Sequence, residues 1–315
     1  DLDWSDRERC ARAWYVSEEK LEPRLGERFE EPIAPYAQPL APARDAAAAV
    51  EERFGADDLL EWNLDVLMAV ARALSFAHSR RILHRDVKPS NVMVGSFGEV
   101  YLMDWGIAFD MDAPPEPEEV DQPSGTTGYM SPEQLGHHDG RLGPWTDTYL
   151  LGATLYHLLT GRPPHTGVPV MDRIEEPDPV PPIPDHVPDE LRGIIARALD
   201  PNPVSRTVSP EALRREVVAF LSHRAALRLA DRGDRDRAAA EAAGHDPTHF
   251  EQASLAADLA YRAALDEWPA CEQAREGRRA VQALRVQQAL DDDDLHLARR
   301  LGLRQFDPFH IGIAG

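Results

Sequence analysis

The sequence predicts a mainly α protein of the α+β class, and three observations carry that prediction. From Leu59 onward, mainly apolar residues recur at three- and four-residue steps, which is typical of the buried face of an amphipathic helix. Two short apolar runs, residues 92–94 and 100–103, flank a turn-forming sequence at residues 95–98 and predict a small β-hairpin. Beyond residue 222 the composition shifts to Ala, Arg and Leu, which favours further helices. The helical stripe consists of Leu60, Leu64, Leu67, Ala71, Leu74 and His78.

The first 56 residues form a segment that we leave unassigned. Residues 1–30 are highly charged and are expected to be helical, and residues 45–56 are expected to restart a helix. Between them, residues 31–44 contain four prolines and predict an extended linker.

The middle of the chain, residues 57–222, is expected to form one domain. After the hairpin, residues 110–123 are acidic and rich in proline, which predicts an exposed loop. Residues 145–160 are apolar on most faces and end at Gly161, so they predict a buried helix. A proline-dense connector follows at residues 177–188, and residues 190–199 and 210–221 predict two amphipathic helices.

Residues 223–315 predict an α-helical tail. Breaks are expected near Gly233, residues 244–247, Pro269 and residues 291–294. The pattern suggests helical hairpins of the tetratricopeptide kind, although a clean period of about 34 residues does not emerge. The four aspartates at 291–294 lack the glycine and final glutamate of a calcium loop and are interpreted as a helix N-terminus.

Charge and cysteine content restrict the functional classes. The 315 residues contain 55 Asp and Glu against 34 Lys and Arg, so a phosphate backbone or an anionic membrane surface would be repelled, and no nucleic-acid partner is expected. No stretch reaches the apolar length of a membrane span. The two cysteines, Cys10 and Cys271, lie far apart and fit free thiols in a reducing compartment, which predicts a cytoplasmic protein.

Three motifs point to a function. The first is the octapeptide His84-Arg85-Asp86-Val87-Lys88-Pro89-Ser90-Asn91. The second is Asp104-Trp105-Gly106, and the third is Gly125-Thr126-Thr127-Gly128-Tyr129-Met130-Ser131-Pro132-Glu133. In this order and spacing they resemble the catalytic loop, the metal-binding motif and the end of the activation segment of serine/threonine protein kinases. The chain is similar to the bacterial branch of eukaryotic-like kinases over residues 57–222, which implies the large lobe of a signalling enzyme that acts on protein substrates.

The resemblance assigns expected catalytic roles. Asp86 orients the substrate hydroxyl, and Lys88 meets the transferring phosphate. Lys88 is one of only two lysines beside 32 arginines, so a lysine here by chance is improbable. Asn91 and Asp104 are expected to hold Mg²⁺, which makes ATP and Mg²⁺ the implied cofactors. Met93 is expected to form the floor of the adenine pocket with Met103 beside it, although a plain core position is as good a reading for Met93.

The resemblance also implies structural roles around the activation segment. Arg85 is expected to hold this segment by contacting it, and Thr126 is expected near the substrate-binding loop. Thr127 stands where the family often has proline. Glu133 and Arg206 match a structural ion pair, and Asp147 is expected to accept backbone hydrogen bonds from the catalytic loop. His84 is interpreted as a packing residue, and the pair at 137–138 as a solvated loop.

The loop before Thr126 suggests a hypothesis about regulation. Residues 107–125 contain a single hydroxyl, that of Ser124, together with six acidic residues. Fixed carboxylates could therefore reach Arg85 and partly replace a phosphate, so that phosphorylation is not required to order the loop, although a solvated acidic loop without a partner, kept extended by its prolines, is the favoured alternative. The acidic residues are Asp110, Asp112, Glu116, Glu118, Glu119 and Asp121.

The small ATP-binding lobe of the family is not recognisable in residues 1–56. That region has two distant glycines, Gly26 and Gly55, and one lysine, Lys20, without the apolar strand that would carry a phosphate-binding lysine. We therefore expect a fragment or a truncated kinase. A kinase-like scaffold that binds protein partners, in part through the tail, is the alternative. A small-molecule phosphotransferase is disfavoured by Lys88 and the segment 125–133.

Overall fold

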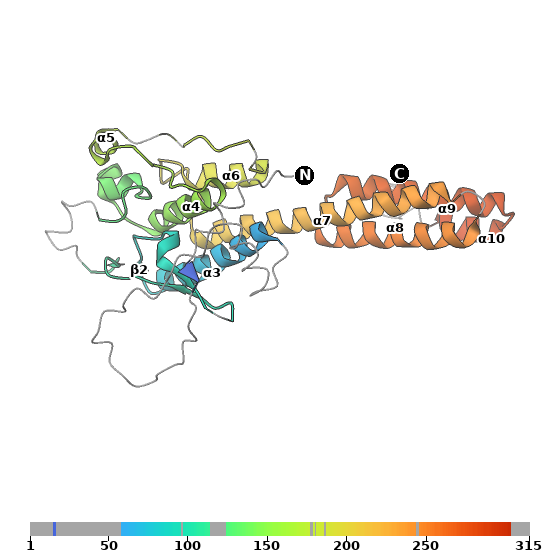
Figure 1. Cartoon of the computed structure of the whole chain (residues 1–315), viewed down its shortest axis with the longest axis horizontal. Coiled ribbons are helices and arrows are strands. Elements are labelled where there is room, and N and C mark those ends of the chain that lie inside the picture. Colours follow the sequence, from blue (N-terminus) through green and yellow to red (C-terminus); the bar gives the residue numbers. More distant parts are fainter. Residues whose placement is uncertain are drawn as a thin grey trace, which may run out of the picture. The chain divides into compact units, whose positions relative to one another are not determined.

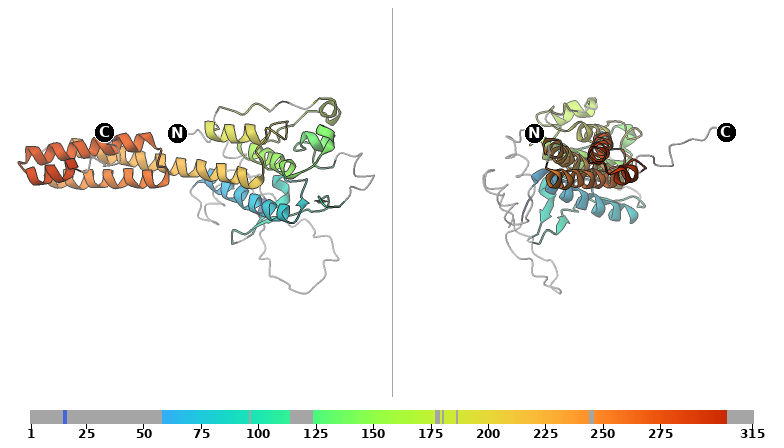
Figure 2. Two further views of the ribbon diagram at one scale, coloured as in Figure 1. Left: turned by 180° about the vertical axis from the view of Figure 1, so that it is seen from behind. Right: turned by 90° about the vertical axis from the view of Figure 1, so that its right-hand side faces the viewer.

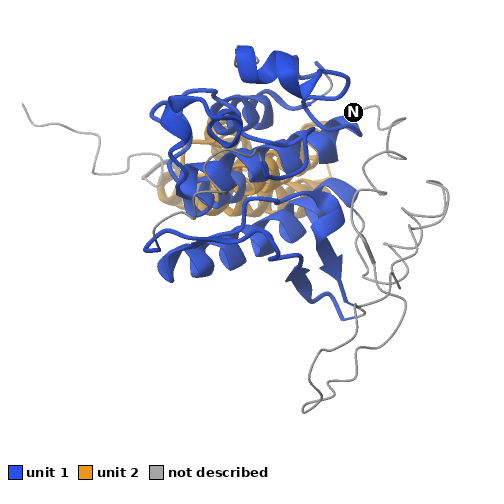
Figure 3. Ribbon diagram, turned by 90° about the vertical axis from the view of Figure 1, so that its left-hand side faces the viewer, with its two compact units in different colours: residues 1–218 blue, residues 219–315 orange. Residues whose placement is uncertain are grey.

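A computed structural model describes residues 15–16, 58–95, 97–113, 124–176, 179, 181–185, 187–243 and 246–303. The chain divides into two compact units, residues 1–218 and 219–315, which are coloured separately in Figure 3. The helix α7 (Pro210–Ala242) begins in the first unit and ends in the second. The boundary expected between residues 222 and 223 therefore lies inside a continuous helix.

The first unit is built on two long helices, α3 (Leu59–Ser79) and α4 (Pro144–Thr160), which contact each other (Figure 1). Helix α3 begins where the side chain of Asp58 accepts a hydrogen bond from the backbone nitrogen of Glu61, at 3.2 Å. Its buried residues follow the predicted stripe, with Leu64 and Leu67 fully buried. The prediction for this helix is confirmed.

Helix α4 is buried around most of its circumference, as its sequence predicts. Gly161 ends the helix in the left-handed conformation, with φ of 75°. Helix α6 (Asp189–Ala198) packs on α4 at Gly152, where an added Cβ would meet the Cβ of Ala198 at 2.5 Å. This glycine therefore permits the close approach of the two helices.

Two small sheets carry the loops of the first unit. Strand β3 (Val92–Val94) pairs antiparallel with β4 (Val100–Leu102), which confirms the predicted hairpin, while β1 (Tyr15–Val16) adds a parallel edge strand to β3. Strands β2 (Ile82–Leu83) and β5 (Phe109–Asp110) form a second antiparallel pair. The described residues of this unit also contain α5 (Val170–Glu175) and the 3₁₀ turns η2 (Pro89–Asn91), η3 (Pro132–Leu135) and η4 (His138–Gly140).

The expected N-terminal helix is wrong at the two residues that the structure describes there. Tyr15 and Val16 are a strand, which pairs in parallel with Met93 and Val94 of β3. The rest of residues 1–56, including Lys20, Gly26 and Gly55, lies outside the described residues. The acidic loop expected at 110–123 begins as the end of β5, and its residues 114–123 are also outside them.

The second unit consists of the C-terminal part of α7 with α8 (Pro247–Glu267), α9 (Glu272–Asp291) and α10 (Leu295–Leu303), seen again in Figure 2. Its core is a cluster of small residues around one aromatic ring: Ala226, Ala230, Ala257, Tyr261, Ala264, Cys271, Ala274 and Val281. Three predicted helix breaks, at residues 244–247, Pro269 and 291–294, are confirmed. At the last of them, Asp294 accepts a hydrogen bond from the backbone of Leu297 at 2.9 Å.

The break predicted at Gly233 is wrong, because α7 continues through it to Ala242. An added Cβ at Gly233 would meet the ring of Tyr261 at 2.6 Å, and one at Gly277 would overlap the same ring. The two glycines thus leave room for the ring of Tyr261 on α8 and do not break their helices. Among the described residues, no helix is both long and apolar enough to span a membrane.

Candidate active site

The carboxylate of Asp86 is the centre of the site. Its Oδ2 accepts hydrogen bonds from Lys88 Nζ at 2.6 Å and from Asn91 Nδ2 at 3.0 Å. Its Oδ1 accepts from the backbone nitrogen of Thr126 at 3.0 Å and from the Thr126 hydroxyl at 2.7 Å. Four of the sequence-predicted site residues therefore meet at one carboxylate, and Lys88 also donates to the Thr126 hydroxyl at 2.5 Å.

These contacts set the charge of Asp86. Burial by itself raises the pKa of the carboxyl, but the hydrogen bonds from Lys88 and Thr126, the charge of Lys88 and the hydrogen bond from Asn91 outweigh burial and lower the pKa below its ordinary value. The group is therefore ionised at neutral pH. An ionised carboxylate can accept a hydrogen bond from a hydroxyl and orient it, while its low basicity makes full proton removal late in the reaction.

The catalytic loop is held by hydrogen bonds to the side chain of Asp147 on α4, which is fully buried. Its Oδ1 accepts from the backbone nitrogen of Arg85 at 2.8 Å, and its Oδ2 accepts from that of His84 at 2.9 Å. The ring of His78 from α3 lies 2.7 Å from Oδ2 through its Nε2. Arg85 has φ of 68°, so the loop carries backbone strain that these bonds offset.

His84 does more than the packing role expected for it. Its Nδ1 accepts from the backbone nitrogen of Asp86 at 3.2 Å, and its Nε2 donates to the carbonyl of Met103 at 2.9 Å. This pattern requires the neutral tautomer with the proton on Nε2. The ring centres of Trp105 and His84 lie 4.5 Å apart in an edge-on arrangement. One buried imidazole therefore joins the catalytic loop to the motif that contains Asp104.

Asn91 and Asp104 fit a magnesium ion in their donor chemistry. Both side-chain hydrogen bonds of Asn91 use its amide nitrogen, which donates to the carbonyl of Asp86 at 2.8 Å and to its Oδ2 at 3.0 Å and turns the amide oxygen away from Asp86. Asp104 is exposed, with φ of 61°. No group of three His, Cys, Asp or Glu in the described part of the chain could hold a metal. Two oxygen ligands suffice for Mg²⁺, which keeps waters and substrate phosphates as its other ligands.

The methionines expected at an adenine pocket flank this region. Met93 lies on β3 and Met103 directly after β4, and both are partly buried. The backbone nitrogen of Met103 donates to the carbonyl of Asn91 at 2.8 Å. Their backbones are therefore tied to the catalytic loop, and their role toward a nucleotide stays a prediction.

The side chain of Arg85 contacts a backbone carbonyl and an aromatic ring of the activation segment. Its Nε donates to the carbonyl of Ile107 at 2.5 Å, and the guanidinium lies 5.4 Å from the ring centre of Phe109. Of the acidic residues proposed to reach Arg85, Asp112 instead pairs with Arg81 at 2.9 Å. Asp110 accepts from the backbone of Asp112, and the other four carboxylates lie outside the described residues.

The residues Thr126–Met130 form a turn, called the substrate turn below, next to Asp86. Gln134, which the sequence did not single out, joins the segment just before this turn to the catalytic loop: its Nε2 donates to the carbonyls of Ser124 and Arg85, each at 2.8 Å. Thr127 is exposed, whereas Ser124 is partly buried. A side-chain amide that bonds distant backbone carbonyls leaves no periodic or compositional signal in a sequence.

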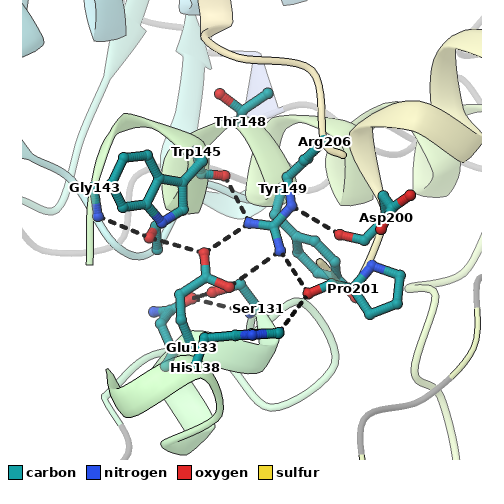
Figure 4. Close-up of polar contacts among 12 residues, drawn as sticks. Ser131, Glu133, His138, Gly143, Trp145, Thr148, Tyr149, Asp200, Pro201 and Arg206 are labelled. Atoms are coloured by element: carbon teal, nitrogen blue, oxygen red, sulfur yellow. Dashed lines mark hydrogen bonds and ion pairs between the residues drawn. The ribbon is translucent and has the colours of Figure 1, made fainter. Parts of the chain in front are cut away.

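Glu133 and Arg206 form a fully buried ion pair, drawn in Figure 4. The guanidinium makes two hydrogen bonds to the carboxylate, at 2.7 and 3.1 Å. The Thr146 hydroxyl donates to Glu133 at 2.9 Å, and Arg206 also donates to the carbonyl of Trp145 at 2.9 Å and lies 4.8 Å from the ring centre of Tyr149. The end of the activation segment is thereby fixed to α4 and to the loop before α7.

The expectation of a solvated loop at residues 137–138 holds for His138, which is exposed, whereas His137 is partly buried. His137 donates through Nε2 to the carbonyl of Arg173 at 2.7 Å, and His138 donates to that of Pro201 at 3.1 Å. Both rings thus hold neighbouring segments of the first unit.

Comparison with known proteins decides the family. The protein kinase domain matches residues 58–218, which is half of the chain and contains every residue of the site described above. The chain belongs to the protein kinase family. Kinases of this family use ATP and Mg²⁺, and the mainly helical residues 58–218 with their small hairpin form a kinase-like large lobe.

The similar kinases are bacterial. The chain is 37% identical over 147 residues to the serine/threonine-protein kinase PknA of Mycobacterium tuberculosis, a match that covers 45% of this chain and 33% of PknA. It is 35% identical over 161 residues to the kinase PknB of the same organism, which covers 49% of this chain and 25% of PknB. The chain thus matches about a third or less of the length of these relatives.

Proposed function

We propose that the first unit transfers the γ-phosphate of ATP to serine and threonine hydroxyls of proteins. The observation that carries this proposal is the carboxylate of Asp86, with Lys88, Asn91 and Thr126 all within 3.0 Å of it. In a transfer step, the hydroxyl oxygen forms a bond to the γ-phosphorus, the bond to the bridging oxygen of ATP breaks, and ADP leaves.

Each side chain of the site has a role in this proposal. Asp86 accepts a hydrogen bond from the acceptor hydroxyl and orients its lone pair toward the phosphorus, and the hydroxyl proton leaves in that direction. Lys88 places its positive charge where the transferring phosphoryl oxygens lie. Asn91 and Asp104 are assigned to Mg²⁺, which supplies positive charge at the phosphates, and Met93 and Met103 are assigned to the adenine ring.

The proposed domain organisation follows the same reading. Residues 57–222 are assigned to the large lobe and residues 223–315 to a helical tail, with residues 1–56 unassigned. The free buried thiol of Cys271 supports a reducing compartment and hence the cytoplasm.

A kinase-like scaffold is the second candidate, favoured by a specific observation. Asp104 is exposed, and Trp105 beside it is 38% exposed, so in the described residues the nucleotide side of the large lobe is open. In this candidate the tail binds protein partners. Leu255 and Leu259, one turn apart on α8 and both exposed, are suited to such contacts.

A phosphotransfer assay separates the two candidates. Radiolabelled ATP is offered with three peptides that differ only in a Ser, Thr or Tyr acceptor, for this chain and for the longest reading frame that contains it. The kinase proposal expects label on the Ser and Thr peptides and little on the Tyr peptide. Absence of label with both proteins would refute it in favour of the scaffold.

A further inference from the structure

The short helix α5 buries a single side chain, that of Arg173, which is 2% exposed. Its guanidinium reaches the substrate turn, where NH1 donates to the carbonyl of Thr127 at 2.7 Å and NH2 donates to the carbonyl of Met130 at 2.7 Å. A planar guanidinium with two bonds of this length holds its acceptors in a defined relative position. Arg173 therefore clamps the second and the last residue of the turn from outside it.

Two other carbonyls of the turn accept hydrogen bonds from backbone nitrogens. The carbonyl of Thr126 accepts from the nitrogens of Tyr129 and Met130, at 2.8 and 3.1 Å, and that of Gly128 accepts from the nitrogen of His165 at 3.3 Å. Arg173 is thus the side chain that supplies the remaining donors to Thr127 and Met130. Without it, the carbonyl of Met130 would lose a charged donor in a buried place and that of Thr127 would lose one in a partly buried place, which is costly above all at Met130.

The clamp is itself anchored, and it acts close to the reacting groups. The carbonyl of Arg173 accepts from His137, and its backbone nitrogen donates to the carbonyl of Pro169. At the other side, the Thr126 hydroxyl at the start of the turn donates to Asp86 at 2.7 Å. The five residues of the substrate turn therefore connect Arg173 to the catalytic carboxylate of Asp86.

We propose that Arg173 is a positioning residue for the protein substrate. It holds the substrate turn so that the polypeptide next to the acceptor hydroxyl lies in register with Asp86, and it touches neither the nucleotide nor the reacting atoms. The inference rests on the proposed kinase function. It adds a determinant of substrate binding on α5, which contributes no residue to the motifs in the sequence.

Steady-state kinetics test the role. Arg173→Met should raise the KM for the protein or peptide substrate by about tenfold or more, since two charged hydrogen bonds are lost, and leave the KM for ATP within about twofold. Arg173→Lys, whose single ammonium cannot span both carbonyls, should lie between. Met171→Ala, an exposed change on the same helix, is the control. An equal rise of both KM values, or a loss of kcat with the peptide KM unchanged, would overturn the inference.

Hydrogen exchange tests the clamp without requiring activity. The amide protons of Tyr129 and Met130, both bonded to Thr126, should exchange at least about tenfold faster in Arg173→Met and faster also in Arg173→Lys. Amides of α4 should keep their rates. Unchanged exchange in the turn, or the same acceleration in α4, would overturn the inference even in an active kinase. If the chain transfers no phosphate, the kinase proposal fails and the exchange result still decides the clamp.

Discussion

Glu133 and Arg206 lie 73 residues apart in the sequence, yet their side chains form two hydrogen bonds with no exposure to solvent. Removing one partner leaves the other charge buried and uncompensated. We expect Glu133→Gln or Arg206→Met to lower the free energy of unfolding by about 3 to 5 kcal/mol.

A double-mutant cycle measures this pair by chemical denaturation. The double variant should lose less than the sum of the single losses, because the second change removes the orphaned charge. The solvent-accessible pair Glu211 and Arg214, 2.7 Å apart on α7, serves as the control and should show little coupling, because solvent screens it. Additive losses at Glu133 and Arg206 would contradict the role of the ion pair in joining the activation segment to the lobe.

Asp104 should determine the metal dependence of nucleotide binding. Asp104→Ala removes a carboxylate ligand, so the affinity for Mg·ATP should fall by at least about tenfold and lose its dependence on Mg²⁺. Calorimetric titration of the wild type and the variant, with and without the metal, checks this. Asp112→Ala, which removes an exposed carboxylate paired with Arg81, should bind as the wild type does. Identical affinity and metal dependence in Asp104→Ala would rule out the assignment.

His157 should make the first unit sensitive to acid. The hydroxyl of Tyr129 donates to its Nδ1 at 2.5 Å, and burial lowers the pKa of His157 from 6.5 to about 4. The folded state therefore favours the neutral ring, and its contribution to stability is present above pH 6.5 and is lost as the pH falls toward 4.

The loss attributable to His157 should reach about 3 kcal/mol between these limits. His157→Gln keeps a neutral acceptor for Tyr129 but does not titrate. The difference in unfolding free energy between wild type and variant, followed from pH 7 to pH 4.5, should move in favour of the variant. A difference independent of pH would show that His157 is protonated equally in both states.

Gly277 should be irreplaceable in the second unit. In an open helix, Gly→Ala stabilises a protein by about 0.5 to 1 kcal/mol, but a Cβ here overlaps the Tyr261 ring, so Gly277→Ala should destabilise by about 1 to 3 kcal/mol. Gly193→Ala on α6 is the control, because its Cβ would meet only the flexible end of Arg197, at 3.2 Å. Thermal unfolding measures both. Stabilisation by Gly277→Ala would contradict the packing of α8 against α9.

The elements that the sequence predicted well are those with a clear period or a stop signal. The stripe of α3 and the glycine that ends α4 each reflect local chemistry that one segment contains. Strands β2 and β5 were missed because two residues have no period. Gly233 was misread because the ring that requires its small size comes from another helix.

The candidate site divides in the same way. Asp86, Lys88 and Asn91 lie within one octapeptide, so their proximity could be predicted from the motif. Gln134 and Arg173 could not be found, because each bonds backbone carbonyls more than 40 residues away, 49 for Gln134 to Arg85 and 46 for Arg173 to Thr127. Every residue has the same backbone carbonyl, so the sequence does not indicate which carbonyl a side chain will bond.

The central claim is that the carboxylate of Asp86 orients the hydroxyl that receives the phosphate. Asp86→Asn keeps the size of the side chain and removes its charge, and Asp139→Asn at an exposed position of η4 is the matched control. Initial rates of label transfer from radioactive ATP to a Ser peptide are the measurement, with circular dichroism to verify folding. The account predicts a rate at least about 100-fold lower for folded Asp86→Asn and unchanged for Asp139→Asn. A wild-type rate in Asp86→Asn would contradict it.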